Sequence, residues 1–179
     1  MTVRVNASCG LDVTETVAAA YSPASPADGV SNVRRFNAYN QLNKILDGST
    51  TPIADTVVDL SFALSGGTTK TWDLTAAPDA KNTAATVDLS GKKLVAMLIT
   101  APTDNNAAGI TIVPGASNGY DILGGSSDRL TIYPGQTVCL FQLGAAANWD
   151  AVAAGDKTID FTGTDGDEID ILAVFGTQS

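Results

Sequence analysis

The stretch TVVDLSFAL, residues 56–64, alternates apolar and polar side chains with a period of two. Every second residue from Val58 to Leu64 is apolar, and the intervening Asp59 and Ser61 are polar. Because successive side chains of a β-strand point to opposite faces, this pattern predicts a strand with one buried face and one solvated face.

Short apolar stretches of the same kind follow along the rest of the chain, separated by turns rich in Gly, Pro, Asn and Asp. They comprise residues 69–74, 86–89, 94–100, 110–113, 120–123, 129–133, 137–143, 157–161 and 168–175. This spacing is typical of an all-β fold, an antiparallel β-sandwich or jelly roll of about 8–10 strands. Strands do not alternate with helical segments, which excludes a doubly wound fold.

The first 50 residues have a different character. Residues 33–46, VRRFNAYNQLNKIL, carry an apolar residue at every third or fourth position, which predicts one short amphipathic α-helix. Residues 11–21 fit either a helix or a strand, and we favour a strand or an extended arm. The sequence therefore predicts an N-terminal arm with a helix over residues 1–50 and a β-sandwich domain over residues 51–179.

The net charge of −9 is unevenly distributed along the chain. Residues 1–50 contain four basic and four acidic residues, so the whole acidic excess lies in residues 51–179. Such a surface repels phosphate and anionic lipid, so we expect no direct nucleic-acid binding and no membrane partner.

The commonest general base of enzymes near neutral pH is missing. The chain has no histidine, which removes Ser-His-Asp triads, Cys-His dyads and histidine-based zinc sites. We therefore expect no catalytic residues, no cofactor and no enzymatic activity. Cys9 and Cys139 are too few for a disulfide framework, and whether they pair is left open. Cys139 lies in the apolar stretch VCLFQL, and we expect it in the core.

The segment TGTDGDEID, residues 162–170, is the strongest candidate for a metal site. Asp165, Asp167 and Asp170 supply the hard oxygen ligands that calcium takes, although the spacing of a calcium-binding loop is absent. The simpler interpretation is a β-hairpin with a two-residue turn at Asp165-Gly166. We favour the hairpin.

Aromatic and basic side chains suggest two other kinds of site. A sugar-binding groove would draw on Trp72, Trp149, Tyr120 and Tyr133, although the alternation around Trp72 favours a core position for that residue. The polar face of the predicted helix carries Arg34, Arg35 and Lys44. It is either an ordinary solvated face or a basic element that docks onto an acidic partner.

One long stretch resembles a known class of proteins. KKLVAMLITAPTDNNAAGITIVPGASNGYDILGGSSDRLTIYPGQTVCLF, residues 92–141, and KTIDFTGTDGDEIDILAVFG, residues 157–176, are similar to auxiliary capsid proteins of bacteriophages, which decorate or cement the head. An upstream element, residues 33–52, adds to the resemblance. The resemblance implies a jelly-roll-like sandwich that binds between major capsid subunits, often as a trimer, without catalytic residues.

The expected function is therefore that of a structural virion protein, a homo-oligomer on the capsid surface whose partner is the major capsid protein. Two alternatives remain open. One is a tail- or fibre-associated or carbohydrate-binding attachment module. The other is a cellular β-sandwich adhesin, which would need an export signal. Arg4 and Asn6 interrupt the apolar residues at the N-terminus, so we expect synthesis in the host cytoplasm without export by a signal peptide.

Overall fold

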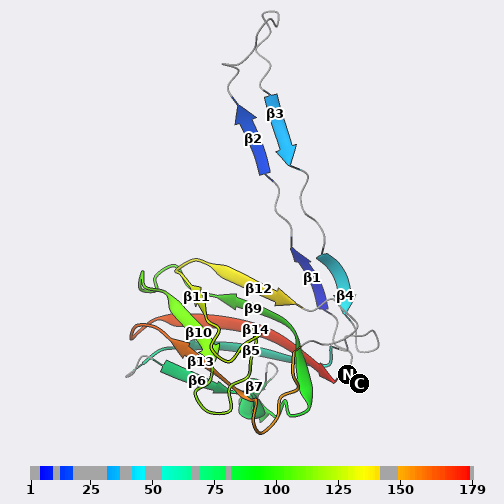
Figure 1. Cartoon of the computed structure of the whole chain (residues 1–179), viewed down its shortest axis with the longest axis vertical. Helices are drawn as coiled ribbons and strands as arrows, with labels where there is room; N and C mark the ends of the chain where they lie inside the picture. Colours follow the sequence, from blue (N-terminus) through cyan, green and yellow to red (C-terminus); the bar gives the residue numbers. More distant parts are fainter. Residues whose placement is uncertain are drawn as a thin grey trace, which may run out of the picture. The chain divides into compact units, whose positions relative to one another are not determined.

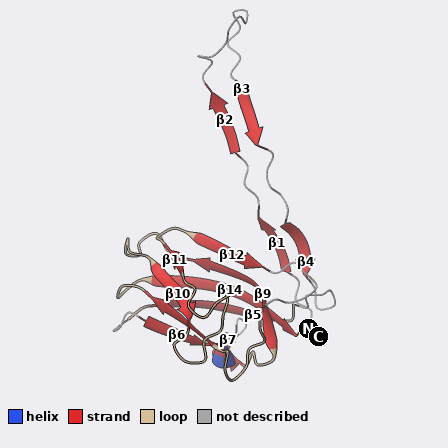
Figure 2. Ribbon diagram, viewed as in Figure 1, coloured by secondary structure: helices blue, strands red, loops and turns tan. Residues whose placement is uncertain are grey.

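The computed structural model describes residues 5–9, 13–17, 32–36, 42–46, 54–65, 69–79, 82–141 and 149–177. The chain divides into two compact units, one of residues 1–5 with 46–179 and one of residues 6–45. The described residues of both units are mostly in β-strands, and the described helical structure is limited to a single 3-10 turn, η1 (Leu74–Ala76), drawn in blue in Figure 2.

The larger unit contains two four-stranded antiparallel sheets (Figure 1). In spatial order, the first sheet consists of β12 (Thr137–Phe141), β9 (Lys92–Thr100), β14 (Glu168–Thr177) and β5 (Thr56–Ala63). The second consists of β11 (Leu130–Ile132), β10 (Ile110–Pro114), β13 (Thr158–Thr162) and β6 (Thr69–Asp73). A short pair, β7 (Ala77–Asp79) and β8 (Asn82–Val87), follows η1. The predicted all-β class is confirmed.

Strand β14 lies in the interior of the first sheet and pairs along its length with both β9 and β5. Its side chains alternate, so that Ile169, Ile171 and Ala173 are buried while Asp170 and Leu172 are exposed. Every second residue therefore faces the other sheet, as the period of two in the sequence predicts.

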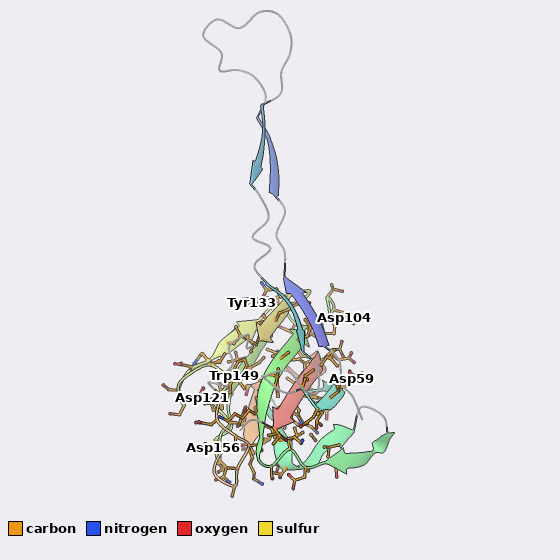
Figure 3. The ribbon with its side chains drawn as sticks, turned by 90° about the vertical axis from the view of Figure 1, so that its right-hand side faces the viewer. Asp59, Asp104, Asp121, Tyr133, Trp149 and Asp156 are labelled. Carbon is orange, nitrogen blue, oxygen red and sulfur yellow. The ribbon has the colours of Figure 1, made fainter. Side chains whose placement is uncertain are left out.

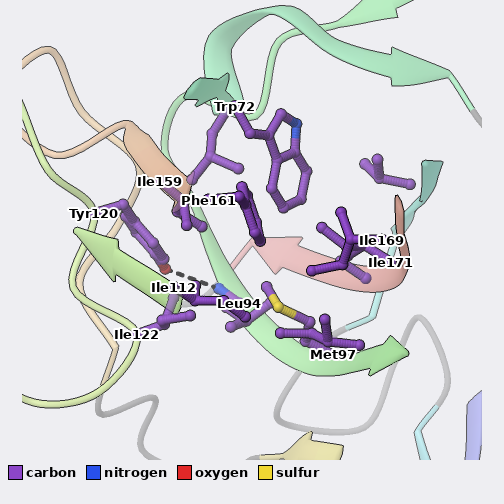
Figure 4. Close-up of a cluster of buried hydrophobic side chains, with 14 of the residues drawn as sticks. Trp72, Leu94, Met97, Ile112, Tyr120, Ile122, Ile159, Phe161, Ile169 and Ile171 are labelled. Atoms are coloured by element: carbon purple, nitrogen blue, oxygen red, sulfur yellow. Dashed lines mark hydrogen bonds between the residues drawn. The ribbon is translucent and has the colours of Figure 1, made fainter. Parts of the chain in front are cut away.

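The inner faces of the two sheets share one hydrophobic core (Figure 4). Met97 and Ile171 of the first sheet belong to the same cluster as Ile112, Ile159 and Phe161 of the second. Replacing a fully buried isoleucine of this cluster by alanine should cost roughly 2–5 kcal/mol. An edge-to-face ring contact of 5.2 Å between Phe62 and Phe161 joins β5 to β13.

The chain passes from one sheet to the other between β13 and β14. A tight turn is present, because Asp167 N–H donates to Thr164 O at 3.1 Å and Gly166 has a φ of 90°. The predicted hairpin is nevertheless wrong, since β13 and β14 pair with different neighbours in different sheets. A turn motif specifies only the local reversal of the chain, whereas core packing decides which strand the next segment joins.

Residues 115–120 form a loop that lies along β13. The backbone N–H groups of Gly115 and Tyr120 both donate to Thr158 O, at 2.9 and 2.7 Å. A Cβ atom at Gly115 would collide with the Thr158 side chain, and Asn118 has a φ of 56°. The GASNG sequence therefore provides the small residues that this close approach requires.

Two further local expectations are wrong. Residues 120–123 form no strand, because the Asp121 carboxylate accepts from Leu123 N–H and Gly124 N–H, at 3.0 and 2.7 Å, and folds the backbone into a turn. Cys139 is exposed rather than buried. Cys139 of β12 lies opposite Leu98 of β9, on the outer face of the first sheet. The apolar stretch alone does not show which of its residues face outward, because that depends on the register of the strands.

In the smaller unit, the described residues form strands where a helix was expected. β1 (Val5–Cys9) pairs with β4 (Leu42–Leu46), and β2 (Val13–Val17) pairs with β3 (Asn32–Phe36). The predicted helix over residues 33–46 is therefore wrong, whereas the strand favoured within residues 11–21 is present as β2. The segment contains three Asn residues, which are poor helix formers, and strand pairing supplies hydrogen-bond partners to its backbone.

Asp55 ties the end of β14 to the start of β5. Its carboxylate forms a 2.7 Å ion pair with Lys92 Nζ and accepts from Thr177 N–H and Oγ1 at 3.1 and 3.0 Å. Burial alone would raise the pKa of Asp55, but the hydrogen bonds from Lys92, Thr56 and Thr177 outweigh it and lower this pKa to about 2. The folded state therefore favours the ionised carboxylate.

Asp55→Asn should lower the free energy of unfolding at neutral pH by about 1 kcal/mol, a value discounted because the pair is partly solvated. Since the folded-state pKa of about 2 lies below the ordinary 3.8, this stabilisation is present above pH 4 and is lost as the pH falls toward 2. Urea unfolding of both proteins across this range measures it. Equal acid sensitivity of variant and parent would contradict the assignment.

Candidate functional site

The outer face of the first sheet exposes two leucines. Leu172 of β14 and Leu98 of β9 are directly paired across the strands, and their exposed fractions are 44% and 37%. Residues opposite each other in an antiparallel pair point to the same side of the sheet. We call Leu98 and Leu172 the leucine pair. Tyr133 is the other large apolar residue that is exposed in the described part of the chain.

The leucine pair continues a second, smaller apolar cluster. Ala54, Val95, Ala96 and Val174 are buried together, with Val57 packed against them. Val174 lies two residues along β14 from Leu172, so both belong to the same face of that strand. An irregularity in the β9–β14 register beside Val174 shifts the alternation of β9, so that neighbouring residues of β9 can join one cluster.

Acidic and polar residues surround the leucine pair. Asp59 lies opposite Leu172 on β5, and Asp170 lies two positions away on β14, paired with Ser61 and Thr100. On the outer face of the sheet, the leucine pair therefore lies between the polar residues around Asp170 and the apolar cluster around Val174. Water-exposed apolar area with a polar rim is typical of a surface that binds another protein.

The predicted metal ligands do not converge. Asp167 is almost fully buried, whereas Asp165 and Asp170 are exposed. The two carboxylate oxygens of Asp167 accept from Asn106 N–H at 2.6 Å and Thr164 N–H at 2.7 Å. Within the described ranges, no group of three or more His, Cys, Asp or Glu residues is placed to hold a metal ion.

Asp167 instead belongs to a contact between two loops. The side chain of Asn105 both donates to Glu168 O at 2.6 Å and accepts from Glu168 N–H at 2.7 Å. Together with Asp167, it holds residues 101–109 against the start of β14. The carboxylate of Asp167 therefore satisfies one backbone donor in each loop.

Two of the four aromatic residues proposed for a sugar site are in the core. Tyr120 is fully buried, and its hydroxyl donates to Asp150 O at 2.8 Å and accepts from Leu94 N–H at 3.2 Å, the dashed bond in Figure 4. Burial raises the pKa of Tyr120 to about 12. Trp72 is only 5% exposed, as the sequence predicts. Neither ring offers a face to a sugar.

Trp149 lines a shallow hollow of about 320 Å³ with residues 121–124 and Asp150. Its indole N–H donates to Ile122 O at 3.1 Å, which fixes the ring against the loop. Figure 3 shows Trp149 beside Asp121, with Tyr133 farther away in that view. Tyr133 does not line this hollow. The structure therefore brings one aromatic residue and two carboxylates together.

The predicted basic docking residues are placed only by their strands. Arg34 and Arg35 belong to β3, where they stand opposite Glu15 and Thr14 of β2, and Lys44 belongs to β4. Their side chains lie outside the described part of the structure. The docking role of these three residues stays a prediction.

The chain matches no protein family model, no curated protein and no solved structure. None of the helical structure in the described ranges has the length and apolar character needed to cross a bilayer.

The leucine pair does not stand out in the sequence, because LVAMLIT, residues 94–100, is apolar from Leu94 to Ile99 and shows no alternation that would mark an outward face. A signal was nevertheless present in β14, where Leu172 shares the alternation of Glu168 and Asp170. An apolar residue in register with two acidic ones on a strand indicates an exposed apolar position.

Asp167→Ala should lower the free energy of unfolding by about 2–4 kcal/mol, because two backbone N–H groups would lose a buried acceptor. Asp170→Ala, on the exposed face of β14, should change it by less than about 0.5 kcal/mol. Chemical denaturation of both variants measures the difference. A melting temperature that falls on addition of a chelator would instead support the metal site.

Proposed function

We propose that this chain is a structural protein of a bacteriophage particle that decorates or cements the capsid by binding between major capsid subunits. In this proposal it acts as a homo-oligomer such as a trimer and is located on the capsid surface. The resemblance of residues 92–141 and 157–176 to auxiliary capsid proteins motivates the proposal. The strand order and the leucine pair support it independently.

The order of the strands supports a jelly roll. In chain order, the eight strands of the two sheets are β5, β6, β9, β10, β11, β12, β13 and β14. The first sheet then contains the sixth, third, eighth and first strands, and the second contains the fifth, fourth, seventh and second. This is the order obtained when a long antiparallel ribbon wraps around a core. Jelly rolls with eight strands are found in viral capsid and lectin domains.

The leucine pair is the observation that carries the docking function. Leu98 and Leu172 expose apolar area on a strongly acidic chain, beside the buried cluster around Val174. A cement protein must cover such area with a neighbouring subunit, and a specific contact buries on the order of 1,200–2,000 Å². Fully burying an exposed leucine contributes about 1.5–3 kcal/mol. Because Leu98 and Leu172 are only 37% and 44% exposed, covering what remains of both contributes about 1–2 kcal/mol in total.

The double variant Leu98→Thr/Leu172→Thr should bind at least about tenfold more weakly to expanded heads that lack this chain, a loss of about 1.4 kcal/mol. Threonine keeps strand propensity but removes most of the apolar contact. Cosedimentation with heads measures the affinity. The melting temperature of the heads with and without bound protein measures cementing.

Tyr133→Thr is the matched control, because it removes the other large exposed apolar residue of the described chain. It should bind heads as the parent protein does. If the parent chain binds neither expanded nor mature heads, the capsid proposal is wrong. If the double variant and the control bind equally well, the leucine pair is not the docking surface.

A second candidate function is an attachment module with a sugar site. The hollow at Trp149 supports it, because an aromatic ring beside Asp121 and Asp150 is a combination that can hold sugar hydroxyl groups. Trp149 is partly exposed and Asp150 is exposed.

Under this alternative, the chain should bind a subset of glycans on an array, and Asp150→Asn should remove that binding. Asp59→Asn is the control, because it makes the same chemical change at an exposed position on β5, which contributes no residue to the hollow. An array without bound glycans, or equal loss in both variants, would eliminate the sugar site.

A further inference from the structure

The outward residues of β14 change in character along the strand. In chain order they are Glu168, Asp170, Leu172 and Val174, so two acidic residues are followed by two apolar ones. Alternate residues of a strand point to the same side, so these four form one row on the outer face of the first sheet. The row is acidic where β14 begins and apolar where it approaches its end.

The neighbouring strands follow the same division. Asp170 stands opposite Ser61 of β5 and Thr100 of β9, which are both polar. Val174 stands opposite two members of the apolar cluster described above. The leucine pair lies between these two zones, and Asp59 continues its row onto β5.

The carboxylates on this face have no basic neighbour in the same rows. Asp59, Glu168 and Asp170 are all exposed. Lys and Arg occupy none of the outward positions of β14 from Glu168 to Val174, and none of the positions paired with them on β5 and β9. The ion pairs found among the described residues use other carboxylates, those of Asp55 and Asp73. The negative charge beside the leucine pair is therefore not compensated within these rows.

This charge restricts what can cover the leucine pair. A second copy that applied the same face would bring like charges together, which is unfavourable at an interface. A purely apolar surface would take water from the three carboxylates and return no hydrogen bond. A Lys or Arg side chain satisfies both requirements, because its aliphatic stem covers apolar area while its charged head reaches a carboxylate.

We infer that the surface that covers the leucine pair is basic. It places apolar side chains on Leu98 and Leu172, and Lys or Arg side chains against Asp59 and Asp170. The division along β14 sets its orientation, with the basic part over the start of the strand and the apolar part toward Val174. This assignment rests on the proposed docking role of the leucine pair, and it adds the charge and the orientation of the partner.

The test measures the rate at which the chain associates with expanded heads that lack it. The parent rate should fall as sodium chloride is raised from about 0.1 M to about 1 M, because the screening length shortens from about 10 Å to about 3 Å. The variant Asp59→Lys/Asp170→Lys should associate at least about tenfold more slowly at 0.1 M salt, because a basic partner then meets like charge. Its rate should also depend less steeply on salt.

Asp128→Lys/Asp156→Lys is the matched control, because it changes the net charge by the same amount. Both residues are exposed, in loops that lead into β11 and β13 of the second sheet. At 0.1 M salt this variant should associate as the parent does. All four substituted positions are exposed, so both variants should keep the melting temperature of the parent, which verifies the fold.

The possible failures are distinguishable. If the parent binds no heads, the proposed function is wrong and the basic partner is overturned with it. If the parent binds and Leu98→Thr/Leu172→Thr weakens binding, but Asp59→Lys/Asp170→Lys associates as fast as the parent, only the basic partner is overturned. Equal slowing in both charge variants would overturn it too, because the net charge of the chain would then be responsible. Unweakened binding by the leucine variant would place docking elsewhere and also overturn it.

Discussion

The simultaneous pairing of β14 with β9 and β5 is the constraint on which the rest of the structure depends. Its inward residues, such as Ile169 and Ile171, contribute to the shared core, and its outward residues include Leu172. The contacts of Asp167 and Asn105 hold its beginning, and Asp55 holds its end. Because a shift of one residue would exchange the two faces, these polar contacts and the apolar alternation must specify the same register.

Because the chain wraps around the core in this way, its loops have a structural role beside that of the strands. Consecutive strands often lie in different sheets, so the connections between them cross the edges and ends of the core. Loop 115–120 bonds to Thr158, and loop 101–109 bonds to Glu168. These contacts join positions that are far apart in sequence, and they satisfy backbone groups that would otherwise be buried without partners.

Carboxylates and apolar groups have different surroundings in the described part of the structure. Many carboxylates of the described residues are exposed or accept hydrogen bonds from nearby backbone N–H groups, as that of Asp121 does. Two features depart from this pattern, the leucine pair on the first sheet and the orphan donor of Trp72 at the sandwich edge. The first is apolar area exposed to water, and the second is a buried donor without an acceptor.

The sequence by itself determined the all-β class, most strand positions after residue 55 and the core position of Trp72, because alternation and turn residues are local properties. Only the tertiary structure decided that β13 and β14 enter different sheets, that residues 32–36 and 42–46 pair as strands, and that Leu98 and Leu172 face outward. The physical reason is that strand pairing and burial depend on residues distant in the chain. A local pattern defines two faces, and the packing of the whole molecule decides which one meets water.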